Sequence, residues 1–470
     1  MNTINFNDFQ TTIQTFNKSE YFSNKSKDLQ NVIYSLENQG ETLCFLESAT
    51  ESQAKSIYSI LAFGTNFKLE GEEISHKLEQ TIIQTKHLTN ENLQMVGALF
   101  GYISYNSVRH FEPTVKCGNP SLIPDGLMFL PKTIIIIENK TDKFHIASIN
   151  KINENNSIEE TLNLIKEAHV PTNFKHTQTS SKAQGQMQAK VQGHFHENVG
   201  FYSNITENDY KSMVEDSIKY IKKGDIFQIV PSIRFFKEYT KHPLEFYAKL
   251  KSINPSPYMF YFSSFYNNEE YHIIGASPEI LINCQNNEIT LRPLAGTIKR
   301  GQTPQEDEQN AAELLSNPKE ISEHLMLLDL GRSDIGRIAT KTWVEKQMVI
   351  EKYSHVMHIS STVKGTLDQK YSMVDVLKSG LPAGTLSGAP KIRAMQIISQ
   401  LETISRDFYA GTLGYISHNT LQTCIMLRCV LIKNNTLHAQ AGAGVVYDSS
   451  PQSEYQECIN KVRAIAVASQ

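Results

Sequence analysis

The chain has 470 residues, of which 40% are hydrophobic and 20% charged, a composition typical of a soluble globular protein with a sizeable core. Its net charge of −4 argues against a nucleic-acid partner, because proteins that bind nucleic acids usually carry a basic face. Six cysteines without a C-x-x-C spacing argue against a disulfide framework or a zinc cluster, and they favour the reducing cytoplasm. We expect no signal peptide and no membrane span, because the N-terminus lacks a basic region with an apolar run and all apolar stretches are short.

Residues 1–175 predict an N-terminal domain of strands with a few helices. Short apolar runs, such as Leu43–Leu46 and the β-branched run Thr133–Ile137, alternate there with turn-forming residues. Residues 176–203 are polar and poor in aliphatic side chains, so they predict a loop or linker.

Residues 204–470 predict a second domain with clearer signals. Thr206 and Asp209 match a capping box, and the apolar face that follows predicts a helix that ends before Gly224. Further helices are predicted over 305–316, 318–335, 388–402 and 452–468, with strands around 273, 280–284 and 289–291. Helices and strands are mixed without a strict βαβ rhythm, so we predict an α+β fold with two domains.

Two predicted helices each carry a pair of glutamates three residues apart: Glu320 with Glu323, and Glu454 with Glu457. Residues at this spacing lie on one helix face. In the first helix Ile321, Leu325 and Leu328 would then face the core. Two such glutamate pairs can surround an oxygen-preferring cation such as Mg2+, and the absence of a Cys or His rhythm argues against zinc. The alternative is that both pairs lie on solvated helix faces.

Other candidate residues leave two interpretations open. Glycine-rich segments, including Gly442–Gly444, can present backbone N–H groups to an anion or can simply turn the chain. Arg428 lies in an apolar run and needs an anionic partner if buried, which is either a structural carboxylate or a carboxylate of the substrate. His355 and His358 alternate along a predicted strand, where a histidine either packs or acts as an acid or base.

Several of these segments together resemble the chorismate-utilising enzymes in order and spacing. They are RPLAGT, EHLMLLDLGRSD, YSHVMHIS, LPAGTLSGAPKIRAMQII, GYIS, LRCVL, AGAGVVYDSSPQSEYQE and NKVRA. FLESAT (45–50) and NPSPYMFYF (254–262) are similar to component I, the large subunit family of anthranilate synthases. The resemblance implies a two-domain α/β sandwich, with tryptophan bound by the smaller N-terminal domain and chorismate by the larger one. Phe45 and Ser333 depart from the family pattern.

The resemblance also implies roles for individual residues. It makes Glu323 and Glu457 the Mg2+ ligands, with Glu320 and Glu454 nearby, and it makes Glu279 the acid near the departing 4-hydroxyl. His358 would lie near the reacting ring. The implied substrate pocket, in which Arg428 and Tyr415 hold the enolpyruvyl carboxylate, consists of Gly296, Thr297, Tyr415, Arg428, Gly442, Ala443, Gly444 and Lys461. The implied tryptophan site consists of Glu47, Ser48, Lys55, Pro257, Tyr258 and Met259.

The implied activity is that of a Mg2+-dependent lyase, the aminase subunit that makes anthranilate and pyruvate from chorismate and ammonia in the first step of tryptophan biosynthesis. Tryptophan would inhibit it, and a separate glutaminase, component II, would supply ammonia within a heterotetramer. Relatives that make aminodeoxychorismate tend to have a lysine at the position of Ala295. Isochorismate and salicylate synthases tend to have a lysine at the position of Gln228. Both positions are uncharged here, which favours attack by ammonia. The alternatives are aminodeoxychorismate synthase component I, another chorismate enzyme, or a tryptophan-binding regulatory protein without activity.

Overall fold

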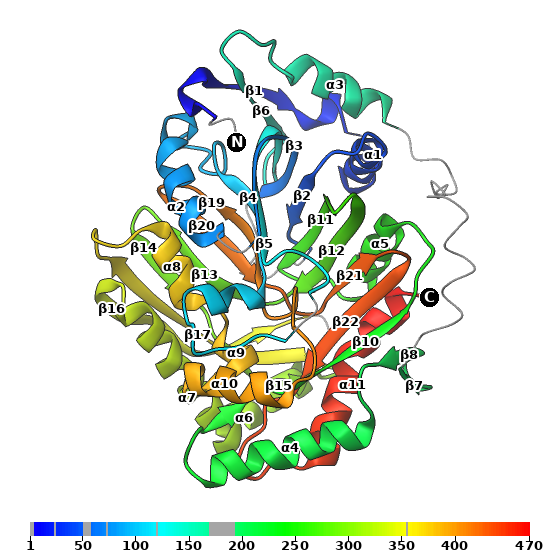
Figure 1. Cartoon of the computed structure of the whole chain (residues 1–470), viewed down its shortest axis with the longest axis vertical. Helices are drawn as coiled ribbons and strands as arrows, with labels where there is room; N and C mark the ends of the chain where they lie inside the picture. Colours follow the sequence, from blue (N-terminus) through cyan, green and yellow to red (C-terminus); the bar gives the residue numbers. More distant parts are fainter. Residues whose placement is uncertain are drawn as a thin grey trace.

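The computed structural model describes residues 4–22, 25–49, 58–71, 74–118, 121–168, 193–353 and 356–470, which form an α+β sandwich (Figure 1). Its α-helices are α1 (Lys25–Asn38), α2 (Ile74–Gln84), α3 (Ile158–Glu167), α4 (Glu207–Lys222), α5 (Pro243–Ile253), α6 (Pro304–Ser316), α7 (Pro318–Gly336), α8 (Met373–Gly380), α9 (Gly384–Ser387), α10 (Lys391–Leu401) and α11 (Pro451–Ala468). Its strands are β1 (Phe9–Asn17), β2 (Leu43–Glu47), β3 (Tyr58–Glu70), β4 (Leu99–Ile103), β5 (Gly126–Glu138), β6 (Lys143–Lys151), β7 (His194–His196), β8 (Phe201–Ser203), β9 (Gln228–Ile229), β10 (Ser232–Glu238), β11 (Tyr258–Tyr266), β12 (Glu269–Ser277), β13 (Ile280–Gln285), β14 (Glu288–Leu291), β15 (Leu294–Lys299), β16 (Ala339–Lys352), β17 (Val356–Leu367), β18 (Gly388–Ala389), β19 (Thr412–Ile416), β20 (Thr420–Ile425), β21 (Cys429–Lys433) and β22 (Thr436–Gly442).

Within the described residues, 20 strands belong to one antiparallel sheet that branches at the long strand β5. One arm runs from β5 through β3, β2, β11, β12, β21, β22 and β10 to β8 and β7. The other arm runs from β5 through β4, β19, β20, β13 and β14 to β17, which also pairs with β15 and β16. Strands β1 and β6 extend the far end of β5.

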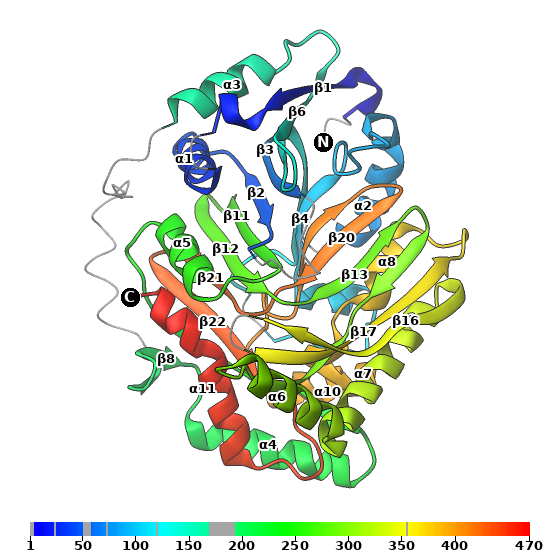
Figure 2. The same ribbon diagram turned by 180° about the vertical axis from the view of Figure 1, so that it is seen from behind.

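Alternation along the strands lets the first arm contribute to two hydrophobic cores. In β11, Phe260 and Phe262 point into the core shared with the second arm, whereas Met259 and Tyr261 point into a core covered by α1, α4, α5 and α11. All four side chains are almost completely buried, and burial of each contributes about 1.5–3 kcal/mol. Figure 2 shows α11 lying across β22 beside α4 on this helical side.

The sheet joins the two predicted domains. β2 and β4 come from residues 1–175, and they pair with β11 and β19 from the region after residue 204. The division into two domains stays a prediction, but its halves share hydrogen-bonded strands. The predicted linker is wrong at its C-terminal end, because residues 194–203 include β7 and β8 and Tyr202 and Ser203 pair with β10.

The predicted helices are present, and α4 begins at the predicted capping box. Thr206 Oγ1 accepts the Asp209 N–H at 3.0 Å, and Asp209 Oδ2 accepts the Thr206 N–H at 2.9 Å. The predicted core face of α7 is partly wrong, since Leu325 is 39% exposed. Its packed face instead contains His324, Leu328 and Ile335, because that face lies against β15, β16 and β17.

The remaining sequence-wide expectations concern cysteines and membranes. All six cysteines are free, and all but Cys117 are buried, as expected for reduced core thiols. In the part of the chain that the structure describes, no helix combines the length and apolar character that crossing a membrane requires.

Candidate active site

A cavity of about 220 Å3 lies between α7, α11 and the ends of β15, β17 and β22. It contains most of the residues that the sequence singled out for substrate, metal and catalysis. Those that line it are Glu279, Gly296, Thr297, Glu323, His358, Arg428, Gly444, Glu457 and Lys461. Ala295 and Gln228, the two positions that separate related activities, also line it.

Helices α7 and α11 bring Glu323 and Glu457 to the same wall. Burial raises the pKa of Glu323, and the neighbouring carboxylates of Glu320 and Glu457 raise it further. Lys461 compensates part of this charge, since its Nζ lies 2.7 Å from Glu457 Oε1 and donates to Gly442 O at 2.8 Å. Glu320 and Glu454 lie on the same two helices without lining the cavity.

The wall beside these glutamates offers oxygen donors. Gln228 Nε2 donates to Glu323 Oε1 at 3.5 Å, and Gln228 Oε1 is buried without a hydrogen-bond partner among the described residues. Carboxylate and amide oxygens are the ligands that Mg2+ prefers. Among the described residues no three of the four glutamates bring ligand atoms within 4.8 Å of one another. A cation here would therefore take further oxygen ligands from substrate and water.

Glu279 is a buried acid that directly precedes β13. Burial raises its pKa to about 8, although the Leu294 N–H and Thr385 favour the charged form. Thr385 Oγ1 donates to Glu279 Oε2 at 3.4 Å. The carboxyl group is therefore mostly protonated at neutral pH, so it can donate a proton into the cavity.

His358 is held as a neutral base by the edge of β15. Its Nδ1 lies 3.0 Å from both Gly296 O and Thr297 Oγ1. A carbonyl oxygen can only accept, so Nδ1 carries the proton and Nε2 has a free lone pair. Burial, with a smaller effect of Arg428, lowers the pKa of His358 to about 4 and keeps the ring uncharged. Its partner strand bulges at Gly296, whose φ of 69° suits glycine.

Arg428 supplies the cavity with a cation that has no ion-pair partner among the described residues. It lies in the turn between β20 and β21 and not within a strand, and its φ is 49°. Burial lowers its pKa. No carboxylate lies within 4.0 Å of its guanidinium in the described part of the chain. Of the two interpretations of this arginine, the structure therefore favours a carboxylate of the substrate.

Tyr415 is not part of this cavity, which corrects the sequence-based assignment. It lies on β19, which pairs with β4, and its ring packs 5.3 Å from that of Phe100. Tyr409 is the tyrosine that lines the cavity.

The glycine-rich segment after β22 is divided between the cavity and the core. Gly444 lines the cavity, and a Cβ there would lie 2.8 Å from Gln228 Nε2. Gly442 takes part through its carbonyl bond to Lys461, whereas Ala443 is completely buried in the core with α11. Glycine at 444 thus keeps the wall open beside Gln228.

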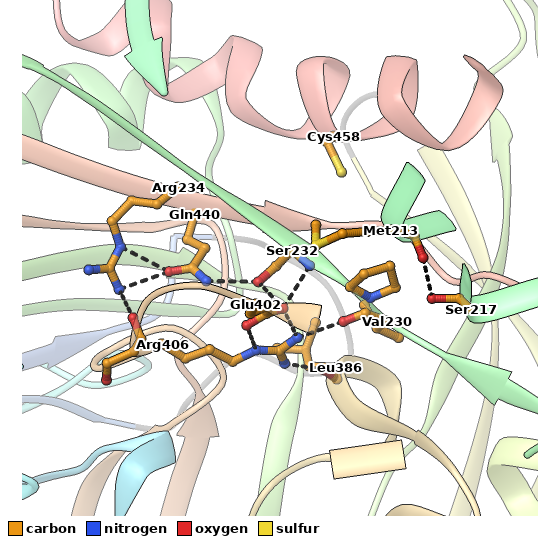
Figure 3. A network of polar contacts seen from close by, with 12 residues as sticks. Met213, Ser217, Val230, Ser232, Arg234, Leu386, Glu402, Arg406, Gln440 and Cys458 are labelled. Atoms are coloured by element: carbon orange, nitrogen blue, oxygen red, sulfur yellow. Dashed lines mark hydrogen bonds and ion pairs between the residues drawn. The ribbon is translucent and has the colours of Figure 1, made fainter. Parts of the chain in front are cut away.

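A buried polar network supports the part of the cavity wall that contains Val230, Leu386 and Gln440 (Figure 3). Arg406 donates to Leu386 O at 2.7 Å and to Val230 O at 2.6 Å, and both of these residues line the cavity. Its guanidinium pairs with Glu402 at 2.5 Å and lies 5.6 Å from the Tyr409 ring centroid. This arginine therefore contacts three residues of the cavity wall at once.

The same network reaches Gln440, which also lines the cavity. Arg234 donates to Gln440 Oε1 at 2.9 Å, and Gln440 Nε2 donates to Ser232 Oγ at 2.7 Å. Ser232 Oγ donates in turn to Glu402 Oε1 at 2.8 Å. Sequence patterns did not indicate these residues, because their partners lie far away along the chain.

The residues expected to bind tryptophan meet outside this cavity, where β2 pairs with β11. Glu47 is opposite Met259, and it accepts bonds from Tyr247 Oη at 2.5 Å and Lys251 Nζ at 2.6 Å. Ser48 Oγ is buried and has no hydrogen-bond partner among the described residues. Pro257 and Tyr258 precede Met259, whose side chain packs in the core. Lys55 lies outside the described residues. The same is true of His355, the second histidine that the sequence offered as an acid or base.

Comparison with known proteins gives consistent results. The family model described as chorismate binding enzyme matches residues 41–467. A protein named anthranilate synthase component 1 from Neisseria gonorrhoeae is 41% identical over 387 residues, which cover 80% of this chain and 75% of that protein. A protein of the same name from Aquifex aeolicus is 36% identical over 461 residues, which cover 93% of this chain and 91% of that protein.

A solved structure has the same fold. It is the crystal structure of anthranilate synthase component I from Streptococcus pneumoniae TIGR4, and its TM-score against this chain is 0.74 at 34% sequence identity. The alignment covers 87% of this chain and 92% of that chain.

Proposed function

The chain belongs to the family of chorismate-binding enzymes, and from this premise we propose the reaction that takes place in its cavity. It is the aminase that converts chorismate and ammonia into anthranilate and pyruvate. As a lyase that makes anthranilate, it acts at the first step of tryptophan biosynthesis.

The observation that carries this proposal is the combination of charges in the cavity. Arg428 is a cation without a carboxylate partner among the described residues, and Glu279 is a protonated acid at neutral pH. Positions 228 and 295 carry no amine that could attack the ring or activate water. Free ammonia is then the nucleophile, which distinguishes this chain from relatives that make aminodeoxychorismate or isochorismate.

The residues divide the chemistry between them. Arg428 holds the enolpyruvyl carboxylate, and Glu279 donates a proton to the 4-hydroxyl so that it leaves as water while ammonia adds at C2. The ammonium group that forms at C2 returns a proton to Glu279, which restores the acid. His358, through its free Nε2, takes the C2 proton while the bond from C3 to the enolpyruvyl oxygen breaks and the ring becomes aromatic. The released enolate takes up that proton at its methylene carbon and becomes pyruvate.

The glutamates of α7 and α11 fit a divalent cation. Glu323 and Glu457, with Gln228 Oε1 beside them, would hold Mg2+ through oxygen atoms alone. When bound, Mg2+ offsets the charge of the ring carboxylate and acts as a Lewis acid. Lys461 orients Glu457 through their 2.7 Å contact.

The proposal is tested with the purified chain, chorismate, Mg2+ and an ammonium salt at alkaline pH. We expect fluorescent anthranilate to appear, to require Mg2+ and to vanish with EDTA. Consumption of chorismate without anthranilate, with another product seen by mass analysis, would assign the chain to a sister reaction. Chorismate that stays intact even with a glutaminase partner present would contradict any catalytic role.

Glu323→Gln and Glu457→Gln are each expected to abolish Mg2+-dependent turnover, by at least about a hundredfold, while the chain stays folded. The amide keeps the size of the side chain but removes the charge that a cation requires. Asp329→Asn is the matched control, because Asp329 lies on α7 and is 74% exposed. Rates are compared across a Mg2+ titration, and near-normal rates in either variant would remove that residue as a ligand.

We also propose that tryptophan binds where β2 meets β11 and inhibits the enzyme from there. Ser48 Oγ has unused hydrogen-bonding capacity, and Glu47 lies beside it with a carboxylate for an amino group. Because this site is separate from the cavity, inhibition would be allosteric.

Ser48→Ala is expected to raise the tryptophan concentration for half-inhibition about tenfold or more and to leave uninhibited turnover intact, since a bond to a charged ligand contributes about 1.5–3 kcal/mol. Ser263→Ala is the control, because Ser263 Oγ is also buried and unpartnered among the described residues but lies further along β11. Tryptophan inhibition curves are measured for the native chain, the Ser48→Ala variant and the Ser263→Ala variant. Equal curves for the native chain and the Ser48→Ala variant would place the effector site elsewhere.

The ammonia source completes the proposal. We propose that a separate component II glutaminase supplies ammonia to this chain, in a heterotetramer of the two subunits in the cytoplasm; the name of its relatives, component 1, supports a second component. High ammonium concentrations would replace the partner in a test tube.

A further inference from the structure

A second group of ionisable side chains lies away from the cavity, where α1, α5 and β12 meet. Glu37 is near the C-terminal end of α1, Glu270 and His272 are two residues apart on β12, and His242 caps the N-terminus of α5. One donor atom from each of Glu37, Glu270 and His272 lies within 4.8 Å of the other two. In the described part of the chain, no other three acidic, histidine or cysteine residues meet this closely.

The distances between the donor atoms suit a metal ion. His272 Nε2 lies 3.0 Å from Glu37 Oε1 and 3.6 Å from Glu270 Oε1. Ligand atoms about 2.0–2.1 Å from a tetrahedral ion stand about 3.3 Å apart, which is between these two values. Alternation along β12 directs Glu270 and His272 to the same face of the strand, and Glu269 to the opposite face.

The carboxylate of Glu37 is fixed and still has an oxygen to offer. Its side chain is only 4% exposed, and Tyr261 Oη donates to Oε1 at 2.6 Å. Oε2 is buried and accepts no hydrogen bond from the described residues. His242 Nδ1 accepts the Leu244 N–H at 3.3 Å, so His242 Nε2 carries the proton, 3.6 Å from Glu37 Oε2. His242 therefore orients Glu37 and is not itself a ligand.

The charge of the group is not balanced by a lysine or an arginine. In the described residues, the only basic side chains within 4.0 Å of the Glu37 and Glu270 carboxylates are those of His242 and His272. Two carboxylates whose oxygen atoms lie within 4.8 Å of each other favour an additional cation. The Glu270 side chain is 42% exposed, so an ion can enter from solvent without opening of the core.

We propose that Glu37, Glu270 and His272 form a binding site for a divalent first-row transition metal ion, with Zn2+ as its representative. An imidazole with two carboxylates suits this class of ion, whereas Mg2+ avoids imidazole. The ion displaces the proton between His272 and Glu37 and leaves a position for water. It links α1 to β12, and thereby fastens the first helix of the chain to the sheet.

The test uses untagged full-length protein and Co2+, whose visible absorption reports its coordination. Millimolar Mg2+ is present throughout, because it competes for the all-oxygen cavity but not for an imidazole site. We expect one equivalent of Co2+ to bind, with Zn2+ displacing it and raising the melting temperature. Glu270→Gln, an exposed and isosteric change, weakens Co2+ binding at least about tenfold, and so does His272→Gln.

Glu269→Gln is the matched control, since Glu269 is the neighbouring carboxylate and pairs instead with Lys433 and Asn434. It keeps the affinity of the native chain. Absence of Co2+ binding in the presence of Mg2+ would overturn the proposal, as would equal binding by the native chain and the Glu270→Gln variant. In either case the group would be an internal ion pair of His272 between two carboxylates.

Discussion

Glu279→Gln is expected to lower turnover about a hundredfold to ten-thousandfold without weakening chorismate binding, since this is the usual contribution of a positioned acid. The amide keeps the shape of the side chain and can still accept the Leu294 N–H, but it has no proton to give to the departing hydroxyl. The measurement is steady-state formation of anthranilate with ammonia as the nitrogen source. An equal loss of chorismate affinity would mean that Glu279 holds the substrate and does not protonate it.

The pH dependence separates these roles further. Burial raises the pKa of Glu279 to about 8, so kcat/KM of the native enzyme at constant NH3 concentration should fall above about pH 8. The Glu279→Gln variant should lack this alkaline decline in its residual rate. A decline of the same shape in both proteins would assign it to another group.

Stability provides an independent check on the same residue. The folded-state pKa of Glu279 lies above the ordinary value of 4.5, so the folded chain holds a proton that the unfolded chain has lost. This contribution is complete below about pH 4.5 and is lost as the pH rises to about 8, at roughly 1.4 kcal/mol per pH unit. Relative to the native chain, Glu279→Gln should therefore unfold at progressively higher urea concentrations between pH 5 and pH 8.

Arg406→Met is expected to reduce the free energy of unfolding by about 3–5 kcal/mol, a large part of the stability of an ordinary domain. The side chains of Arg406 and Glu402 are 1% and 5% exposed, so the variant leaves a buried carboxylate without its cation. It also leaves Leu386 O and Val230 O without their donor. Urea unfolding followed by fluorescence and circular dichroism measures the loss.

Arg332→Met is the matched control, because Arg332 pairs with Asp329 on the exposed face of α7. Exposed pairs contribute about 0–1 kcal/mol, so this variant should be nearly as stable as the native chain. Similar losses in the two variants would show that the network of Arg406 does not support the cavity wall.

The sequence predicted the helices that carry their own start signals. Pro318 and Pro451 stand at the first turns of α7 and α11, and Thr206 caps α4 with the geometry of a capping box. Glu323 on α7 and Glu457 on α11 lie at one wall because each helix buries its apolar face and turns that glutamate toward the cavity. The buried face agrees with the residue spacing in α11 and partly in α7. Local signals of this kind do not depend on the rest of the fold.

Features that depend on distant partners could not be predicted. Glu37 and His272 are 235 residues apart, and Arg234 and Gln440 are 206 apart, so no local pattern connects them. Tyr415 was assigned to the substrate pocket from the family resemblance, whereas the structure places Tyr409 in the cavity wall and Tyr415 on β19 beside β4. The short strands β7 and β8 likewise form because β10 is there to pair with them.

The pairing of β2 with β11 and of β4 with β19 has a consequence for how the chain is made. Residues 43–47 leave the ribosome more than 200 residues before their partner at 259–263 exists, and residues 99–103 wait for 412–416. Until then, the backbone N–H and C=O groups along one edge of β2 and of β4 lack their strand partners. Such unpaired strand edges can form hydrogen bonds with other chains and aggregate. The first half of the protein cannot complete its fold during synthesis. Its strands depend on slow, late closure and on protection from aggregation until the C-terminal strands arrive.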